Sequence, residues 1–447
     1  MQTVIPFRAW RYDPRKAGDL NRLVAPPYDV VDAALQSRLH ARSPHNIVRI
    51  DLGITTPSDN DCENRYTRAA AQLADWKAQG ILARDTRPTM TFVEEKFTGP
   101  DGRTRTRHGF LALLRLHDFG EGVVFPHERT LSGPKEDRFR LVQATGMSLS
   151  PVFMLYDLPG DEITKAWQAG PGATRPANVI VDPDAGAGAT ETRLWPVSDP
   201  ALLESTQQLL AANRFVIADG HHRYETALRY RQYRQQGPTP APACDYVLAY
   251  FSNMADPALA IYATHRLVKG VDPEIVGSLP QILSPTFTVE RLTGEGAAGA
   301  AAARLAITGY LEAHPRGAFG LWGPALDGAY GISLADRDAA REAEPDASPA
   351  YQELDVTILQ SLVLQRALGI TQTDMAAETN VTFFKDPDDA FERLAAGDFQ
   401  VGFFMNPTGL DQIQEVALGG ERMPQKATFF YPKLPTGLVF HDLNSDL

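Results

Sequence analysis

The stretch from Phe215 to Glu225 constrains the fold more than any other part of the chain. Its first four residues are apolar and have the length of a buried strand, and Asp219-Gly220 follows them directly. A helical pattern then begins, with apolar residues at the i, i+3, i+4 spacing of one face as far as Leu228. A strand that turns through glycine into a helix leaves backbone N–H groups and a positive dipole end at the turn. The sequence therefore predicts an α/β element with a natural seat for phosphate.

The first helical turn after this glycine carries three basic residues, His221, His222 and Arg223, where a helix ordinarily favours acidic side chains. An Asp219 N-cap followed by a solvated turn would explain the aspartate but not the cations. Adjacent histidines on a helix point about 100° apart, which disfavours a zinc ion held by both. Contact of phosphate with backbone N–H groups and the fork of Arg223 is therefore the favoured interpretation.

Composition indicates a soluble globular protein of two or three domains: 447 residues, 43% hydrophobic and 22% charged. The net charge of −12 argues against a nucleic-acid partner. The separated cysteines, Cys62 and Cys244, fit neither a disulfide framework nor a zinc motif. No signal peptide and no apolar run of membrane-spanning length are found, so we expect a cytoplasmic protein without a membrane partner. The oligomeric state stays open, with a homodimer as one option.

Three parts are expected along the chain: an N-terminal α/β segment at 1–89, a core at 90–270, and a C-terminal α/β domain at 271–447. The second boundary is placed near residues 270–305, a span that includes the Ala/Gly-rich residues 294–303, and residues 170–189 are expected to form a loop or mobile insertion. Strands are predicted at 46–52, 90–97, 107–116, 149–156, 246–253, 260–267, 319–322, 330–334 and 400–405, and helices at 31–41, 64–79, 138–145, 202–212, 354–368 and 386–396.

Polar residues also gather at His127-Glu128-Arg129-Thr130. This cluster is interpreted either as a surface ion-pair group or as the site of a general base, Glu128, brought to the helix terminus by the fold. The rigid loop Pro26–Val30 either packs Tyr28 or is held against a ligand.

Two further polar places are left with open interpretations. Thr264-His265-Arg266, at a predicted strand end, is as consistent with a structural salt bridge as with a ligand contact. Near the C-terminus, the stretch from Gln425 to Lys433 has clustered aromatics that predict a packed strand, and whether Lys426 faces a pocket is left open.

Five of these motifs, in this order, resemble the "ten-fifteen" family of domains of unknown function, over residues 5–438. They are Pro26–Val30, Pro126–Thr130, Asp219–Ala227, Thr264–Arg266 and Met423–Lys433. Within that family the central segment resembles the ParB/sulfiredoxin-like fold, whose hallmark is a Gly-x-[His/Arg]-Arg turn that opens a helix. The resemblance implies an α/β (α+β) fold class with a ParB/sulfiredoxin-like mixed-sheet core.

Three relatives in that superfamily imply different functions. Sulfiredoxins carry a catalytic cysteine directly after the glycine, where this chain has His221, so sulfinic-acid reduction is excluded. ParB proteins add a basic DNA-binding helical domain, which this acidic chain lacks. The turn of free-serine kinases is similar to Asp219–Arg223, including the aspartate and both histidines, and these enzymes also use an upstream glutamate, for which Glu128 is the counterpart.

This resemblance implies a nucleotide-dependent kinase that phosphorylates a small hydroxyl compound, with L-serine giving O-phosphoserine as the leading reaction. ATP or ADP would be the donor, with Mg²⁺. The alternatives are a ParB-like nucleotide-binding regulatory module without phosphotransfer, and a scaffold protein. The implied roles are catalysis by Glu128, Asp219 and His222; nucleotide binding by Gly220, His221, His222 and Arg223; Mg²⁺ binding by Asp219; and acceptor binding by His127, Arg129, Lys135, Arg138 or Arg266.

Overall fold

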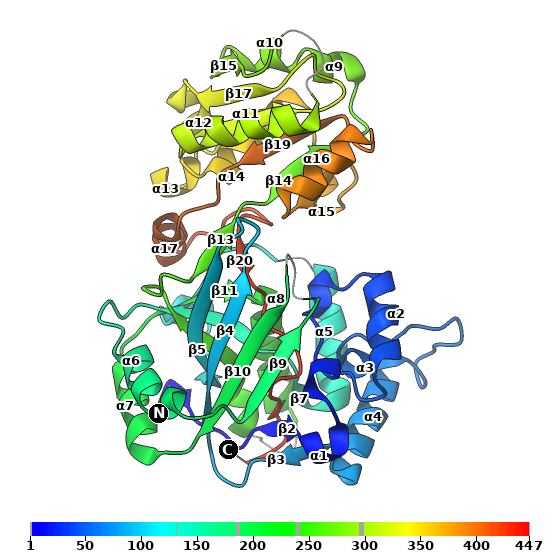
Figure 1. Ribbon diagram of the computed structural model, residues 1–447, viewed down its shortest axis with the longest axis vertical. Coiled ribbons are helices and arrows are strands. Elements are labelled where there is room, and N and C mark those ends of the chain that lie inside the picture. The colour runs from blue at the N-terminus through cyan, green and yellow to red at the C-terminus, as the bar shows by residue number, and fades with distance from the viewer. Residues whose placement is uncertain (1, 131, 185–187, 238–241, 295–298, 447) are drawn as a thin grey trace. The chain divides into compact units, whose positions relative to one another are not determined.

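The structure is a computed structural model that describes residues 2–130, 132–184, 188–237, 242–294 and 299–446 (Figure 1). Its chain forms two compact units. Unit 1 comprises Met1–Pro126, Thr130–Ala260 and Tyr431–Leu447, and unit 2 comprises His127–Arg129 and Ile261–Phe430.

This division differs from the three expected parts. Residues 1–89 belong to the same unit as the core, because their helices share a hydrophobic cluster with Leu141, Met147 and Phe440. The boundary expected near residues 270–305 does not coincide with the start of unit 2. Within that span, the described end of the Ala/Gly-rich stretch begins helix α11 (Ala300–Ala313), and residues 295–298 lie outside the described part. The chain enters unit 2 earlier, at Ile261.

Unit 1 is built on a nine-stranded mixed sheet in the order β6-β11-β8-β12-β5-β4-β10-β9, with β1 paired to β5. The β11–β6 and β12–β8 pairs are parallel and the others antiparallel. Strands β8 and β12 are buried along their whole length, which matches their apolar runs, Val152–Tyr156 and 246–251. The strands are β1 (Val4–Ile5), β4 (Met90–Thr98), β5 (Thr104–Arg115), β6 (Val124–Pro126), β8 (Val152–Tyr156), β9 (Asn178–Asp182), β10 (Thr190–Val197), β11 (Phe215–Asp219) and β12 (Tyr246–Asn253).

Helices lie on both sides of this unit (Figure 1). One hydrophobic cluster joins Trp167 and Leu203 of two helices to sheet residues such as Phe110, and a second surrounds Trp76. The helices are α1 (Pro14–Ala17), α2 (Ala33–Arg42), α3 (Val48–Asp51), α4 (Arg65–Gln79), α5 (Ser132–Thr145), α6 (Glu162–Ala169), α7 (Pro200–Leu210) and α8 (His221–Gln235), with 3₁₀ turns η1 (Leu20–Arg22), η2 (Tyr28–Val30), η3 (Phe119–Glu121), η4 (Pro171–Ala173) and η5 (Pro242–Asp245).

Two local predictions in unit 1 are wrong. Residues 46–52 form the short helix α3 instead of a strand, because the Asn46 side chain accepts from Val48 N at 3.0 Å and donates to the Val24 carbonyl at 2.9 Å. The predicted loop at 170–189 contains β9, which pairs antiparallel with β10; residues 185–187 of that stretch lie outside the described part.

Unit 2 contains a six-stranded sheet in the order β15-β17-β16-β19-β14-β18, in which every pair is antiparallel. Helices α11 and α16 pack against it in one hydrophobic cluster, where the rings of Phe391 and Phe404 stack with centroids 4.0 Å apart. The strands are β14 (His265–Val268), β15 (Phe287–Arg291), β16 (Ala318–Trp322), β17 (Tyr330–Leu334), β18 (Val381–Phe384) and β19 (Val401–Met405).

The other helices of unit 2 are short, and one segment, Leu359–Ala367, is a π-helix. The helices are α9 (Pro273–Gly277), α10 (Leu279–Leu283), α12 (Arg337–Ala343), α13 (Pro349–Gln352), α14 (Asp355–Ile358), α15 (Gln372–Ala376), α16 (Pro387–Ala395) and α17 (Leu410–Leu418).

Three two-stranded pairs complete the described fold: β2 (Trp10–Tyr12) with β3 (Leu82–Arg84), β7 (Met147–Ser148) with β21 (His441–Asp442), and β13 (Ala260–Tyr262) with β20 (Phe429–Tyr431).

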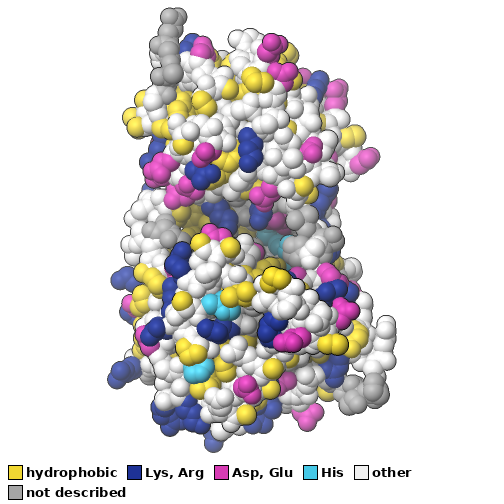
Figure 2. All heavy atoms as spheres, turned by 90° about the vertical axis from the view of Figure 1, so that its right-hand side faces the viewer, with side chains coloured by type: hydrophobic (Ala, Val, Ile, Leu, Met, Phe, Trp, Pro, Cys, Tyr) yellow, Lys and Arg dark blue, Asp and Glu magenta, His cyan; other side chains and the backbone are white. Residues whose placement is uncertain are grey.

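The predicted mixed α/β class with a large mixed sheet is confirmed. Both cysteines are free thiols, as their spacing indicated. Among the described residues, no helix combines the length and the apolar character needed to cross a membrane. Figure 2 shows acidic and basic side chains mixed over much of one face, in keeping with an acidic chain that carries many compensating cations.

Candidate functional site

The predicted strand–turn–helix is present in unit 1, where β11 ends at Asp219 and α8 begins at His221. Gly220 is the N-cap of α8 and has φ +89°, a left-handed conformation that favours glycine. A Cβ at this position would lie 2.8 Å from Arg223 Nε. Because a glycine N-cap has no side chain to bond the first-turn N–H groups, the turn keeps the backbone character of an anion site.

Asp219 is partly buried and lies between two cations. One carboxylate oxygen accepts from Arg223 Nη2 at 2.5 Å, and the other accepts from Lys433 Nζ. Burial alone would raise the pKa of Asp219, but the charges of Lys433 and Arg223 outweigh it and hold the pKa well below its ordinary value. The carboxylate is therefore ionised and held in place by both cations.

The Arg223 side chain connects the turn to neighbouring residues of unit 1. Its Nη1 donates to Ser150 Oγ at 2.9 Å and to the Pro151 carbonyl, while its Nη2 donates to Asp219. These three acceptors hold the guanidinium inside unit 1. An anion at the turn would therefore share Arg223 with Ser150, Pro151 and Asp219. In the same first turn His221 is buried and His222 is partly exposed. Burial raises the pKa of Asp219, whereas Lys433, Arg223 and, to a smaller extent, His221 lower it.

Two of the predicted acceptor-binding cations are already paired in unit 1. Arg138 of α5 bonds Asp51 Oδ1 at 2.9 Å and Asp137 Oδ2 at 2.6 Å, and its guanidinium lies 4.0 Å from the ring centroid of Tyr28. Lys135 Nζ lies 2.9 Å from a carboxylate oxygen of Glu225 on α8. Both cations therefore join helices to their neighbours, and a charged ligand would have to compete with these carboxylates.

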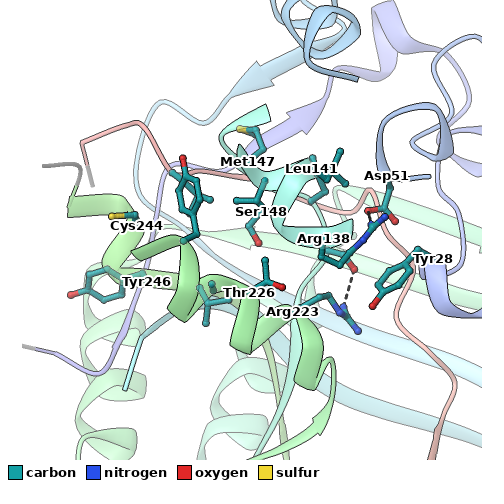
Figure 3. A pocket seen from close by; sticks show the side chains of 17 residues that line it. Tyr28, Asp51, Arg138, Leu141, Met147, Ser148, Arg223, Thr226, Cys244 and Tyr246 are labelled. Atoms are coloured by element: carbon teal, nitrogen blue, oxygen red, sulfur yellow. Dashed lines mark hydrogen bonds and ion pairs between the residues drawn. The ribbon is translucent and has the colours of Figure 1, made fainter. Parts of the chain in front are cut away.

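A pocket with about 630 Å³ of empty space, part of it open to solvent, lies beside these groups, between α5 and α8. Figure 3 shows its charged end, where Arg138, Asp51 and Tyr28 lie together, and its largely apolar end near Cys244. Between them, the buried Thr226 Oγ1 has no hydrogen-bond partner among the described residues. A concave, largely apolar space with a few polar groups is the usual form of a small-molecule site.

Two residues that are distant in the sequence, Asp29 and Lys433, lie near the turn in the folded unit. Lys433 is nearly buried, and although burial opposes its charge, Asp219 and then Asp29 raise its pKa above the ordinary value. Asp29 itself is exposed and has no side-chain hydrogen bond to another described residue. The sequence already indicates the rigid Pro-Pro-Tyr-Asp loop as a candidate ligand contact. It contains no pattern, however, that would predict that this loop lies near Lys433.

Other predicted site residues gather in unit 2. The segment His127–Arg129 forms a parallel bridge with Met423, in which Met423 N donates to the His127 carbonyl at 2.8 Å. Glu128 Oε1 accepts from Lys426 N at 2.9 Å, and His127 Nε2 lies 2.8 Å from Thr428 Oγ1. Two separate sequence motifs are thus joined in this unit.

Arg266 belongs to the same group, since its Nη2 donates to the Lys426 carbonyl at 3.1 Å. Together with Arg129 it lines a second cavity, also with about 630 Å³ of empty space. The structure therefore distributes the predicted residues as follows: Asp219, Gly220, His221, His222, Arg223, Lys135 and Arg138 in unit 1, and His127, Glu128, Arg129 and Arg266 in unit 2.

The described residues contain no group of three or more His, Cys, Asp and Glu side chains positioned to hold a metal ion. Asp219 does not fit the predicted role of a direct Mg²⁺ ligand, because both of its oxygens accept from cationic side chains. A cation at this carboxylate would have to displace Arg223 or Lys433.

The fold has distant likenesses among solved structures. A free serine kinase mutant in complex with ADP is 12% identical, with a TM-score of 0.37 over 73% of this chain and 92% of that one. A conserved hypothetical protein from Pyrococcus furiosus is 14% identical, with a TM-score of 0.35 over 73% and 95%. SbnI with a C-terminal truncation, from Staphylococcus aureus, is 12% identical, with a TM-score of 0.34 over 73% and 87%.

No curated protein matches this chain. A family profile matches residues 4–357, which is well over half of the sequence and includes four of the five motifs quoted above. The chain belongs to the family described as "Protein of unknown function (DUF1015)", as the resemblance to the "ten-fifteen" domains predicted.

Proposed function

We propose that the protein is a nucleotide-dependent phosphotransferase that acts on the hydroxyl group of a small metabolite, with free L-serine as the leading acceptor. The observation that supports this most strongly is the left-handed Gly220 that opens α8 beside a nearly buried, positively charged Lys433. Phosphoryl transfer requires mainly positioning and neutralisation of charge, and this turn offers both. L-serine as acceptor rests on the similarity of Asp219–Arg223 to the turn of free-serine kinases.

In this proposal the N–H groups of the first turn of α8 and the charge of Lys433 receive the phosphates. Asp219 holds Lys433 and Arg223 in place, and His222 contacts phosphate from the same turn. The cavity beside α8 extends from Arg223 to Tyr230, which is about 10 Å along the helix axis. This length suits a nucleoside whose phosphates lie at the helix N-terminus, with ATP or ADP as the donor.

Two carboxylates are candidates for the general base. Glu128 is the candidate from sequence similarity, and its carboxylate is anchored by Lys426 N in unit 2. Asp29 is the candidate from the geometry of unit 1, because it is exposed and close enough to Lys433 to raise its pKa. Mg²⁺ bound to the nucleotide would neutralise the phosphates, and no step is assigned to a metal held by Asp219.

The test is incubation of the full chain with ATP or ADP, Mg²⁺ and a panel of amino acids and other hydroxyl compounds, followed by ³¹P NMR. We expect a phosphomonoester to form with at least one acceptor, and absence of product with every acceptor would refute the proposal. The variants Asp29→Asn and Glu128→Gln are then compared. The general base is the residue whose replacement abolishes turnover while nucleotide binding is retained. The exposed Asp61→Asn and Glu63→Gln are the matched controls.

A second candidate is a nucleotide-binding regulatory module without phosphotransfer. This candidate is favoured because both carboxylate oxygens of Asp219 accept hydrogen bonds from Arg223 and Lys433. The turn is therefore better suited to binding a nucleotide than to holding a catalytic metal ion. The signature of such a module would be tight nucleotide binding, measured by calorimetry, with no dependence of hydrolysis on any acceptor. Product formation in the ³¹P experiment would eliminate this candidate.

A further inference from the structure

Arg266 of β14 is a buried cation without a paired carboxylate among the described residues. Its side chain is almost inaccessible, with the residue 4% exposed. Its guanidinium donates to the Thr264 and Lys426 carbonyls and contacts Met405 Sδ at 3.1 Å. Burial lowers the pKa of Arg266 to about 10, and the charge of Glu128 offsets this only in part. Since burying a charge is costly and Glu128 offsets that cost only in part, an anion bound beside Arg266 would stabilise it further.

The pocket beside Arg266 is positively charged. Arg129 also lines it, and its backbone is fixed by the bond from Arg129 N to the Met423 carbonyl at 3.2 Å. Neither arginine forms an ion pair with a carboxylate of the described residues, and no acidic side chain among them lines the pocket. The ring of Phe383 forms part of the wall, with its centroid 5.4 Å from Arg266 Cζ.

Three glutamines complete the polar lining: Gln360, Gln372 and Gln425. None of their side chains is hydrogen-bonded to another described residue, so their amide groups are available to a ligand. Gln360 projects from the π-helix Leu359–Ala367, and such widened turns occur frequently at functional sites. The lining therefore combines two guanidinium groups, three carboxamides and an aromatic wall in a space of about 630 Å³.

We propose that this unit 2 pocket binds a small organic anion through its carboxylate or phosphate group, which lies between Arg129 and Arg266, while the glutamine amides bind neighbouring hydroxyl or carbonyl groups. Guanidinium is the side chain best matched to planar and tetrahedral oxyanions. Because every charged side chain in the lining is basic, the pocket should favour anions without a positive charge over zwitterions. The inference is independent of nucleotide binding and of phosphotransfer, since every lining residue lies in unit 2.

The test is isothermal titration calorimetry of the full chain at low ionic strength, without nucleotide. Inorganic phosphate and D-glycerate are the two oxyanion probes, and L-serine is the zwitterion. We expect D-glycerate or phosphate to bind at least about tenfold more tightly than L-serine. The probe whose binding is weakened more by the Arg129→Gln substitution identifies which oxyanion the pocket selects, because a phosphate bound at the turn of unit 1 would not respond to this variant.

The key variant is Arg129→Gln, because Arg129 is exposed and its removal should leave the fold intact. It should weaken binding of the preferred anion by about tenfold or more. Arg341→Gln, which removes an exposed arginine of unit 2 outside the pocket, should leave binding unchanged. Gln360→Ala should weaken the binding of D-glycerate more than the binding of phosphate. Equal effects of the two arginine variants, or no heat from either oxyanion at millimolar concentration, would overturn the proposal.

Discussion

Replacement of Gly220 by alanine tests how tightly the phosphate turn is built. The residue has φ +89°, and a left-handed conformation costs an L-residue about 1–2 kcal/mol. The new Cβ would also lie 2.8 Å from Arg223 Nε and 2.9 Å from Cζ. An ordinary surface arginine would swing away at little cost, but this one is held by Ser150, Pro151 and Asp219. Displacing it should cost a further 1.5–3 kcal/mol or so, the usual range for hydrogen bonds to charged groups.

We therefore expect Gly220→Ala to lower the free energy of unfolding of unit 1 by about 2.5–5 kcal/mol, the sum of these two effects. The matched control is Gly122→Ala in the same unit. Gly122 has φ +72°, and no atom lies within 4 Å of the position that a Cβ would occupy, so it should show only the conformational cost of about 1–2 kcal/mol. The difference between the two variants isolates the contribution of Arg223.

The assay is denaturant unfolding of the full chain followed by tryptophan fluorescence. The signal reports mainly unit 1, which holds four of the five tryptophans: Trp10, Trp76, Trp167 and Trp195. Equal losses in the two glycine variants would refute the claim that Arg223 is fixed. A double variant, Gly220→Ala with Arg223→Ala, should lose less than the sum of the two single variants, because the clash disappears with the side chain.

Three further predictions concern buried charges. Burial raises the pKa of Asp355 to about 6, so Asp355→Asn should stabilise unit 2 by up to about 3 kcal/mol near pH 7.5, and the gain should vanish as the pH falls from 6 to 4 in denaturant titrations. Glu95→Gln leaves the fully buried Arg107, which lies 2.7 Å from Glu95, without its counter-charge and should cost about 3–5 kcal/mol; a loss below about 1 kcal/mol would contradict the pairing. Lys433→Met should raise the pKa of Asp219 and destabilise unit 1 at neutral pH. Since a depressed carboxyl pKa stabilises only above the unfolded value, this deficit should shrink below about pH 4, and a pH-independent deficit would contradict it.

Some of the fold could be predicted because its determinants are local. The apolar strand, the glycine and the amphipathic helix at Phe215–Glu225 lie within a few residues of one another, and each favours the same local structure. The strand prediction at 46–52 was wrong for the opposite reason, since its alternating pattern was overruled by hydrogen bonds of the Asn46 side chain to the Arg22 and Val24 carbonyls. The strand at Asn178–Asp182 was missed because its short apolar run, residues 179–181, is flanked on both sides by stretches rich in Gly, Ala, Pro and Asp that are typical of a loop.

The sequence by itself determined the type of turn at Gly220, the basic character of its first helical residues and membership of the family. Only the tertiary structure decided which groups complete that turn: Asp219 meets Lys433 across 214 positions of the chain, and Arg223 bonds Ser150 Oγ and the Pro151 carbonyl more than 70 positions away. Backbone propensity acts over a few residues, whereas the partner of a buried charge is chosen by how distant strands and loops pack. Local patterns could therefore locate the candidate site, but its electrostatics required the folded chain.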